Sequence, residues 1–167
     1  MSYKITHPQI GMPALNDVST IQKWPTGYIA KITDLDAVAP NSGEAIYLLC
    51  GGANVVIGSL VDIDPAAGVV LAPATGGVAS VSASLNIVPS GSYAWFQIEG
   101  KAAVKAPNAM TPGAAVFMLA ATPGSVDDAA VAGEEIVNAE VITSTGTPST
   151  GLALIALNRS FHQGQIT

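Results

Sequence analysis

The middle of the sequence, residues 91–105, is apolar on both sides of an extended pattern. If this stretch forms a strand, Trp95 and Gln97 point to one side of it, and Phe96 and Ile98 point to the other. A strand with large side chains on both faces must be covered twice, so it belongs in the centre of a sheet and away from water. We therefore predict a buried central strand here.

Several other segments have strand patterns. Residues 79–87 carry apolar side chains at odd positions and Ser or Asn at even positions, which predicts a strand with one face on the core and a wetter opposite face. Shorter apolar or loosely alternating runs predict further strands at residues 28–33, 45–50, 55–63, 69–72, 101–106, 114–120, 135–143 and 152–158.

Turn-forming residues separate these segments. Glycine and proline together make up 28 of the 167 residues, and a turn signal recurs about every 8–12 residues. Gly100 is expected to mark a bulge or bend after the central strand. The pattern predicts an all-β fold, with a single β-sandwich or jelly-roll-like domain over residues 28–158 and a C-terminal tail over residues 159–167.

The first 27 residues differ from the rest. Pro8, Pro13 and Pro25 interrupt the segment, and its large apolar side chains follow no strict period. Proline fixes its own φ and favours an extended preceding residue, so we predict an extended N-terminal arm. Two alternatives remain open: the arm lies on a partner, or it folds back on its own domain.

The composition favours a place in an assembly. Only 11% of the residues are charged and 49% are hydrophobic, and a surface with so few charges is poorly protected against association. The net charge is −6 and the six cationic residues are scattered, which does not suit direct nucleic-acid binding. The longest apolar run, Ala114 to Ala121, is too short for a membrane span, and the N-terminus has no apolar secretory segment.

Residues suited to catalysis are scarce. The two histidines, His7 and His162, lie near the ends of the chain, and no Gly-x-Ser-x-Gly or phosphate-loop motif occurs. We expect both histidines to be surface or interface residues. The lone Cys50 excludes an internal disulfide and is expected to be a buried apolar residue on a strand. The sequence therefore predicts no enzymatic activity and no cofactor.

Acidic residues recur in pairs that lack the spacing of a calcium-binding loop. We interpret these pairs as turn caps and solubilising groups, with no metal site predicted. The pairs are Asp34 and Asp36, Asp62 and Asp64, Asp127 and Asp128, and Glu134 and Glu135.

One segment resembles a known family. Residues 93–102, Tyr-Ala-Trp-Phe-Gln-Ile-Glu-Gly-Lys-Ala, are similar to the Tyr-Gly-Trp-x-Gln-x-x-Gly-x-Ala signature of the head decoration (cement) proteins of tailed bacteriophages. Ala94 stands where the family usually has glycine, and Ser160 where it usually has proline. Further segments match the family pattern in the same order, at residues 44–48, 58–61, 124–129, 147–151 and 157–161.

The resemblance implies a β-rich, often jelly-roll domain that forms a homodimer or homotrimer on the outer surface of a mature capsid. Such a protein is made in the bacterial cytoplasm, becomes part of the virion and stabilises contacts between neighbouring major capsid subunits without catalysis. We expect the docking side chains to come from the arm and the tail: Tyr3, Ile5, Ile10, Met12, Leu15, Trp24, Phe161 and Ile166. The alternative function is a glycan- or host-binding module of the virion surface, with Trp24 or Trp95 as an exposed platform.

Overall fold

The computed structural model describes residues 3–34, 41–64 and 68–164, and within these ranges it contains strands and no helix. The predicted all-β fold is therefore confirmed. The strands are β1 (Tyr3–Ile5), β2 (Ile29–Asp34), β3 (Asn41–Leu49), β4 (Leu60–Asp64), β5 (Gly68–Leu71), β6 (Val81–Ser84), β7 (Tyr93–Lys105), β8 (Ala115–Met118), β9 (Val126–Asp127), β10 (Glu135–Val141) and β11 (Leu152–His162).

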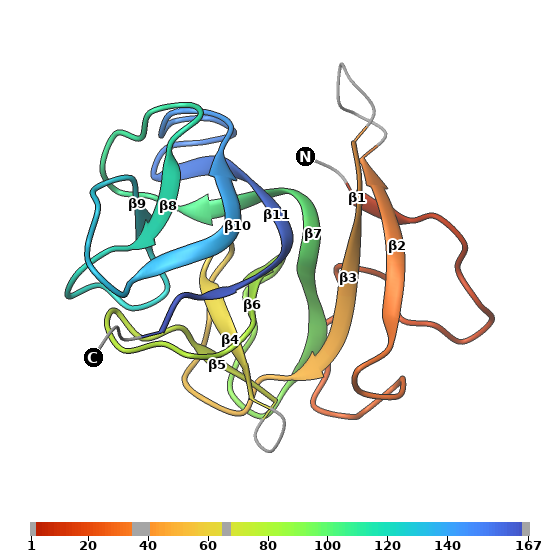
Figure 1. Ribbon diagram of the computed structural model, residues 1–167. Coiled ribbons are helices and arrows are strands. Elements are labelled where there is room, and N and C mark those ends of the chain that lie inside the picture. Colours follow the sequence, from red (N-terminus) through yellow and green to blue (C-terminus); the bar gives the residue numbers. More distant parts are fainter. Residues whose placement is uncertain (1–2, 35–40, 65–67, 165–167) are drawn as a thin grey trace.

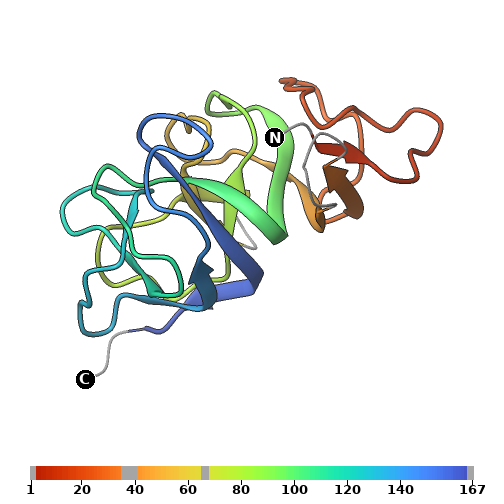
Figure 2. The same cartoon turned by 90° about the horizontal axis from the view of Figure 1, so that it is seen from above.

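The strands form one branched antiparallel sheet that curls into a sandwich-like domain. Its main path runs β1-β2-β3-β7-β11-β10-β8-β9, while β6 pairs with β7 and β4, and β4 pairs with β5. In Figure 1, β1 to β3 lie at one end of the molecule and β8 to β10 at the other, with β7 and β11 between them. Figure 2 shows the N-terminal segment, drawn in red, beside the β1–β3 end.

Strand β7 is the centre of the sheet, as its two-sided apolar pattern predicts. It pairs with β3 along its first half and with β11 along its second half, and Phe96 and Gln97 within the first half also pair with β6. Trp95, Phe96 and Gln97 are fully buried. Trp95 packs with Tyr47 in one hydrophobic cluster and Phe96 packs with Leu48 in another, so the two faces of β7 belong to different parts of the core.

The predicted irregularity near Gly100 is present inside one continuous strand. The register of β7 against β3 shifts at Ile98, so that an extra residue bulges there. Gly100 follows with φ +91°, a conformation that costs glycine little. On β3, Gly43 faces the same bend so closely that an added Cβ would overlap the carbonyl oxygen of Glu99. The two backbones can approach because both positions lack a side chain.

Two strand predictions were wrong in their details. Strand β6 covers only four of the nine predicted residues, and Ser82 and Ser84, which were expected to face solvent, are buried. β6 pairs with β4 and β7 along its two edges and is also contacted by β11, and its polar face is buried as well as its apolar face. The predicted strand at residues 55–63 begins only at Leu60, after a turn at Gly58 with φ +79°.

The N-terminal segment packs on its own domain. Apart from β1, it has little regular structure in the described residues, but the indole Nε1 of Trp95 donates to the carbonyl oxygen of Pro13 at 3.1 Å, and Leu15 is 9% exposed. Of the two alternatives for the arm, the structure places it on the chain itself. At the other end, β11 continues to His162, past the residue at which the tail was expected to begin.

Gly43→Ala tests the close approach of β3 and β7. We expect this variant to lose about 3 kcal/mol of the free energy of unfolding, because the new methyl group must displace backbone rather than a flexible side chain. Ser42→Ala, at the exposed neighbouring position, should change it by less than about 0.5 kcal/mol. Urea unfolding followed by tryptophan fluorescence measures both, and equal effects of the two changes would contradict the close packing of Gly43 against β7.

Candidate functional site

A groove of about 640 Å³ lies between the N-terminal segment and the connection from β6 to β7. Four of the eight predicted docking residues line it, although they are spread over thirteen positions of the sequence. We call it the arm groove. Its lining residues are Tyr3, Lys4, Ile5, Pro8, Met12, Pro13, Ala14, Leu15, Asn16, Leu85 and Asn86.

The walls of the arm groove are tied to the sheet by side-chain hydrogen bonds. The Tyr3 hydroxyl donates to the carbonyl oxygen of Lys101 at 2.6 Å, which holds β1 against β7. Asn86 Nδ2 donates to the carbonyl oxygen of Leu15 at 2.7 Å, which joins the two walls to each other. Together with the bond from Trp95 to Pro13, these contacts give the groove a fixed shape.

The other predicted docking residues lie elsewhere. Ile10 is fully exposed at the tip of a turn in which the N–H of Met12 donates to the carbonyl oxygen of Gln9 and Gly11 has φ +84°. Trp24 is half-buried with its ring edge-on to Tyr28. Phe161 is 41% exposed on β11, opposite Ser80. Ile166 lies outside the described residues.

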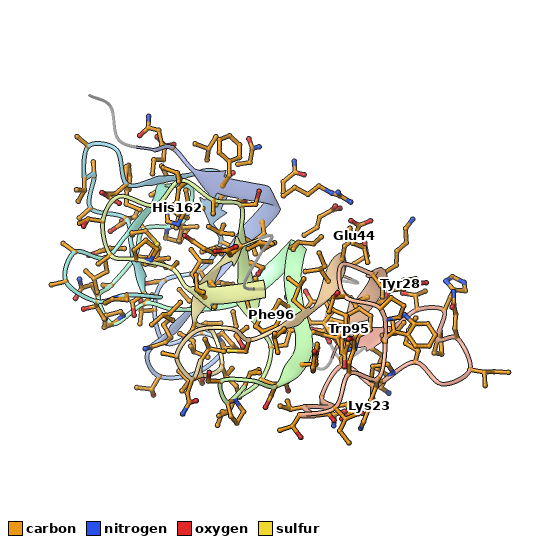
Figure 3. All side chains as sticks on the ribbon, turned by 90° about the horizontal axis from the view of Figure 1, so that it is seen from below. Lys23, Tyr28, Glu44, Trp95, Phe96 and His162 are labelled. Carbon is orange, nitrogen blue, oxygen red and sulfur yellow. The ribbon has the colours of Figure 1, made fainter. Side chains whose placement is uncertain are left out.

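The predicted tryptophan platform of the glycan-binding alternative does not form at Trp95. This side chain is fully buried, and its Nε1 is used by Pro13. Figure 3 shows Trp95 inside the molecule near Tyr28 and Phe96. Tyr28 and Tyr47 pack against the indole ring and Tyr93 stacks on Tyr47, so the main contribution of these aromatic residues is to the core.

A second group of exposed apolar residues was missed by the sequence analysis. The sequence pattern places Val56 and Ile57 in a buried strand and Ile87 on the core-facing side of another. All three are exposed. The bridge between Val55 and Val88 places Val56 and Ile87 opposite each other, so these side chains form one small surface patch. Gly58, in the turn that precedes β4, was the sequence signal that residues 55–57 do not belong to that strand.

His162 is the clearest error among the predicted surface residues. Its side chain is fully buried, and Nε2 lies 2.7 Å from Asp62 Oδ1. Gly77 lies flat against the imidazole ring, where an added Cβ would overlap it. The prediction failed because β11 continues past its expected end and carries His162 into the interior beside β4. His7 is exposed, as expected.

The acidic pairs are also more structural than predicted. Glu134 is buried and accepts a hydrogen bond from the Gly76 N–H at 2.9 Å, while buried Asp127 accepts one from Asn108 at 2.6 Å. The role as turn caps is present at Asp128, where hydrogen bonds from the Thr111 side chain and backbone N–H hold its pKa below the ordinary value. A solubilising role is wrong for the buried members of the pairs.

The described residues contain no group of three or more His, Cys, Asp or Glu side chains that could hold a metal ion. Cys50 is buried on the inside of the fold, and burial raises the pKa of its thiol. None of the described residues belongs to a helix with the length and hydrophobicity that a membrane span requires.

Comparison of the chain with protein-family models and with curated proteins found no match. The candidate site is a preformed, mostly apolar groove beside an end strand of the sheet, with exposed apolar side chains on the turn at Ile10 and in the patch formed by Val56, Ile57 and Ile87.

A double-mutant cycle on Asp62 and His162 tests whether this buried contact holds the fold together. We expect either single change to alanine to lower the free energy of unfolding by about 3 kcal/mol, because each leaves a buried polar partner unsatisfied. The double variant should lose clearly less than the sum of the two, as for residues in direct contact.

His7→Ala, at the exposed histidine, is the matched control and should change stability by less than about 0.5 kcal/mol. Strict additivity of the Asp62 and His162 changes in chemical denaturation would show that the two side chains do not interact.

Proposed function

We propose that the protein is a non-enzymatic capsid decoration (cement) protein that binds the outer surface of an assembled phage head, as a homodimer or homotrimer, and stabilises contacts between neighbouring major capsid subunits. The observation that carries the proposal is the exposure of eight large apolar side chains in the described part of a chain with very few charges. They are Ile10, Ile21, Ile29, Val56, Ile57, Val78, Ile87 and Phe161.

The small free energy of each exposed apolar contact favours this function. Removing one exposed isoleucine from water contributes about 1.5–3 kcal/mol, which is too little for a tight complex by itself. On a capsid lattice, several such contacts made by linked copies add through effective concentration. A protein that binds only the assembled shell then stabilises that shell by mass action. Scattered apolar contacts therefore suit a cement protein better than a high-affinity binder of one small molecule.

The exposed apolar residues also lie at separated places. Ile10 and Ile21 are on the N-terminal segment, which Figure 2 shows at one end of the molecule. Val78 and Phe161 are beside the buried His162, which Figure 3 shows at the opposite end. A protein that joins two neighbouring subunits needs two separate contact surfaces, and this distribution supplies them.

The segments that carry the family resemblance contribute to the scaffold. Glu44, Glu99 and Arg159 come from three of these segments, and the Arg159 guanidinium forms an ion pair with Glu44 and lies 4.0 Å from Glu99. Ser160, at a position where the family usually has proline, uses its hydroxyl to bond the carbonyl oxygen of Asn138 at 2.7 Å. Ala94, at the usual glycine, is buried in the core. The resemblance thus supports a shared fold, and of the predicted docking residues only Phe161 lies in one of the shared segments.

Ile10→Asp tests the proposed function with a point change that leaves the core intact. We expect occupancy on shells of the phage that lack the protein to fall about tenfold or more, because an apolar contact is replaced by a charge that must lose its water. The heat resistance of the shells should fall with occupancy. Co-sedimentation and differential scanning calorimetry of the mixed shells measure the two quantities.

Thr150→Asp, which adds the same charge to an exposed turn, is the control and should bind as the unchanged protein does. Deleting residues 1–27 would be a poor test, because Leu15 and Pro13 are part of the packed interior. Undiminished occupancy of both Ile10→Asp and Val78→Asp would exclude docking through these surfaces.

A further inference from the structure

The arm groove runs along the edge of a strand. Tyr3, Lys4 and Ile5 are three consecutive residues of β1, and all three line the groove. Neighbouring side chains of a strand point to opposite faces, so a hollow on one face would not take all three. The groove therefore borders the backbone of β1 itself, and β1 is the end strand of the sheet.

The hydrogen-bond pattern of β1 tells which backbone groups face the groove. The N–H of Thr6 donates to the carbonyl oxygen of Lys31 at 2.9 Å, so Thr6 and Lys31 form a hydrogen-bonded pair. In an antiparallel ladder such pairs alternate with pairs whose backbone N–H and carbonyl groups point away from the neighbouring strand. Ile5, opposite Ile32, is therefore an outward-pointing residue, and its N–H and carbonyl oxygen face away from β2.

The opposite wall of the groove is apolar and already fixed. Leu15 and Leu85 face the hollow, and the bond from Asn86 to the Leu15 carbonyl holds these two segments together. Lys4 is the one charged side chain among the lining residues, and no acidic residue is among them. The groove thus combines outward backbone groups, an apolar wall and a single positive charge.

We propose that the arm groove binds an extended segment of a partner protein, which pairs with β1 as an additional strand and places a carboxylate near Lys4. Main-chain hydrogen bonds to Ile5 would supply affinity, and alternate apolar side chains against Leu15 and Leu85 would supply register. The carboxylate of the partner segment is inferred from the positive charge of Lys4, whose side chain points to the face of β1 opposite Tyr3 and Ile5. Four or five residues, roughly 13–17 Å of strand, cover the length of β1.

This inference deepens the proposed function by assigning a specific contact to the N-terminal segment, and it rests on that function only for the identity of the partner as a capsid subunit. The groove can be tested without a capsid. A short peptide with the pattern of the proposed segment, acetyl-Val-Glu-Val-Thr-Val-amide, serves as the probe, and the amide resonances of the ¹⁵N-labelled full chain report where it binds.

We expect chemical-shift changes at Ile5, Met12 and Leu85 that saturate at millimolar peptide. A peptide with N-methylated backbone nitrogens should bind at least fivefold more weakly, because it cannot donate to β1. Replacing Glu in the peptide by Lys should weaken binding at least fivefold, and the Lys4→Glu variant should reverse this preference. The reversal separates a charge contact in the groove from a general effect on folding.

Three results would overturn the proposal: no localised shifts with any peptide, equal binding of the N-methylated peptide, or no change of preference in Lys4→Glu. If the same amides instead shift with protein concentration in the absence of peptide, the occupant is a second copy of the chain and the proposed partner is wrong. The shell-binding result for Ile10→Asp does not depend on these outcomes, so failure of the groove and failure of the capsid function can be told apart.

Discussion

The structure depends on covering both faces of β7. This strand pairs with β3, β6 and β11 and contributes side chains to separate hydrophobic clusters on its two sides. Burying Trp95 on one face and Phe96 on the other leaves no free surface for the centre of the sheet. The bend at Gly100, with Gly43 against it, lets one strand serve two partners in succession without a loop between its halves.

The same burial fixes the candidate site. The indole of Trp95 uses its only hydrogen-bond donor on the carbonyl oxygen of Pro13, so the centre of the sheet determines where the N-terminal segment lies. Because the arm groove is formed by that segment, its walls need little ordering when a partner binds, and less of the interaction energy is spent on ordering them. A rigid groove and an exposed turn at Ile10 are thus consequences of the core.

The distribution of charge reinforces the tendency to associate. The chain has only 12 acidic residues, and Asp34, Asp62, Asp127 and Glu134 among them are buried. The buried groups are satisfied, at least in part, by interior partners such as His162, Asn108 and the Gly76 N–H. The surface is therefore poorer in charge than the composition suggests, and exposed apolar side chains have fewer charged neighbours to keep other molecules away.

The sequence by itself determined the all-β fold and the central strand, because an alternating or two-sided apolar pattern is a local property that directly reflects how a strand is covered. It also identified Tyr3, Ile5, Met12 and Leu15 as candidate docking residues, since large apolar side chains in an irregular segment must pack against either a partner or the domain itself. It could not show that they meet in one groove, because the groove depends on contacts such as that between Leu15 and Asn86, 71 positions apart.

The burial of His162 and of Ser82 was likewise decided only by the tertiary structure. A histidine near a chain end, or a serine on an alternating strand, has no local feature that reveals whether a neighbouring strand will cover it. Asp62 lies 100 positions from His162, and their contact exists because β11 passes its expected end and meets β4 and β6 in space. Sequence pattern sets which residues form strands, whereas strand order sets which faces and edges remain open to a partner.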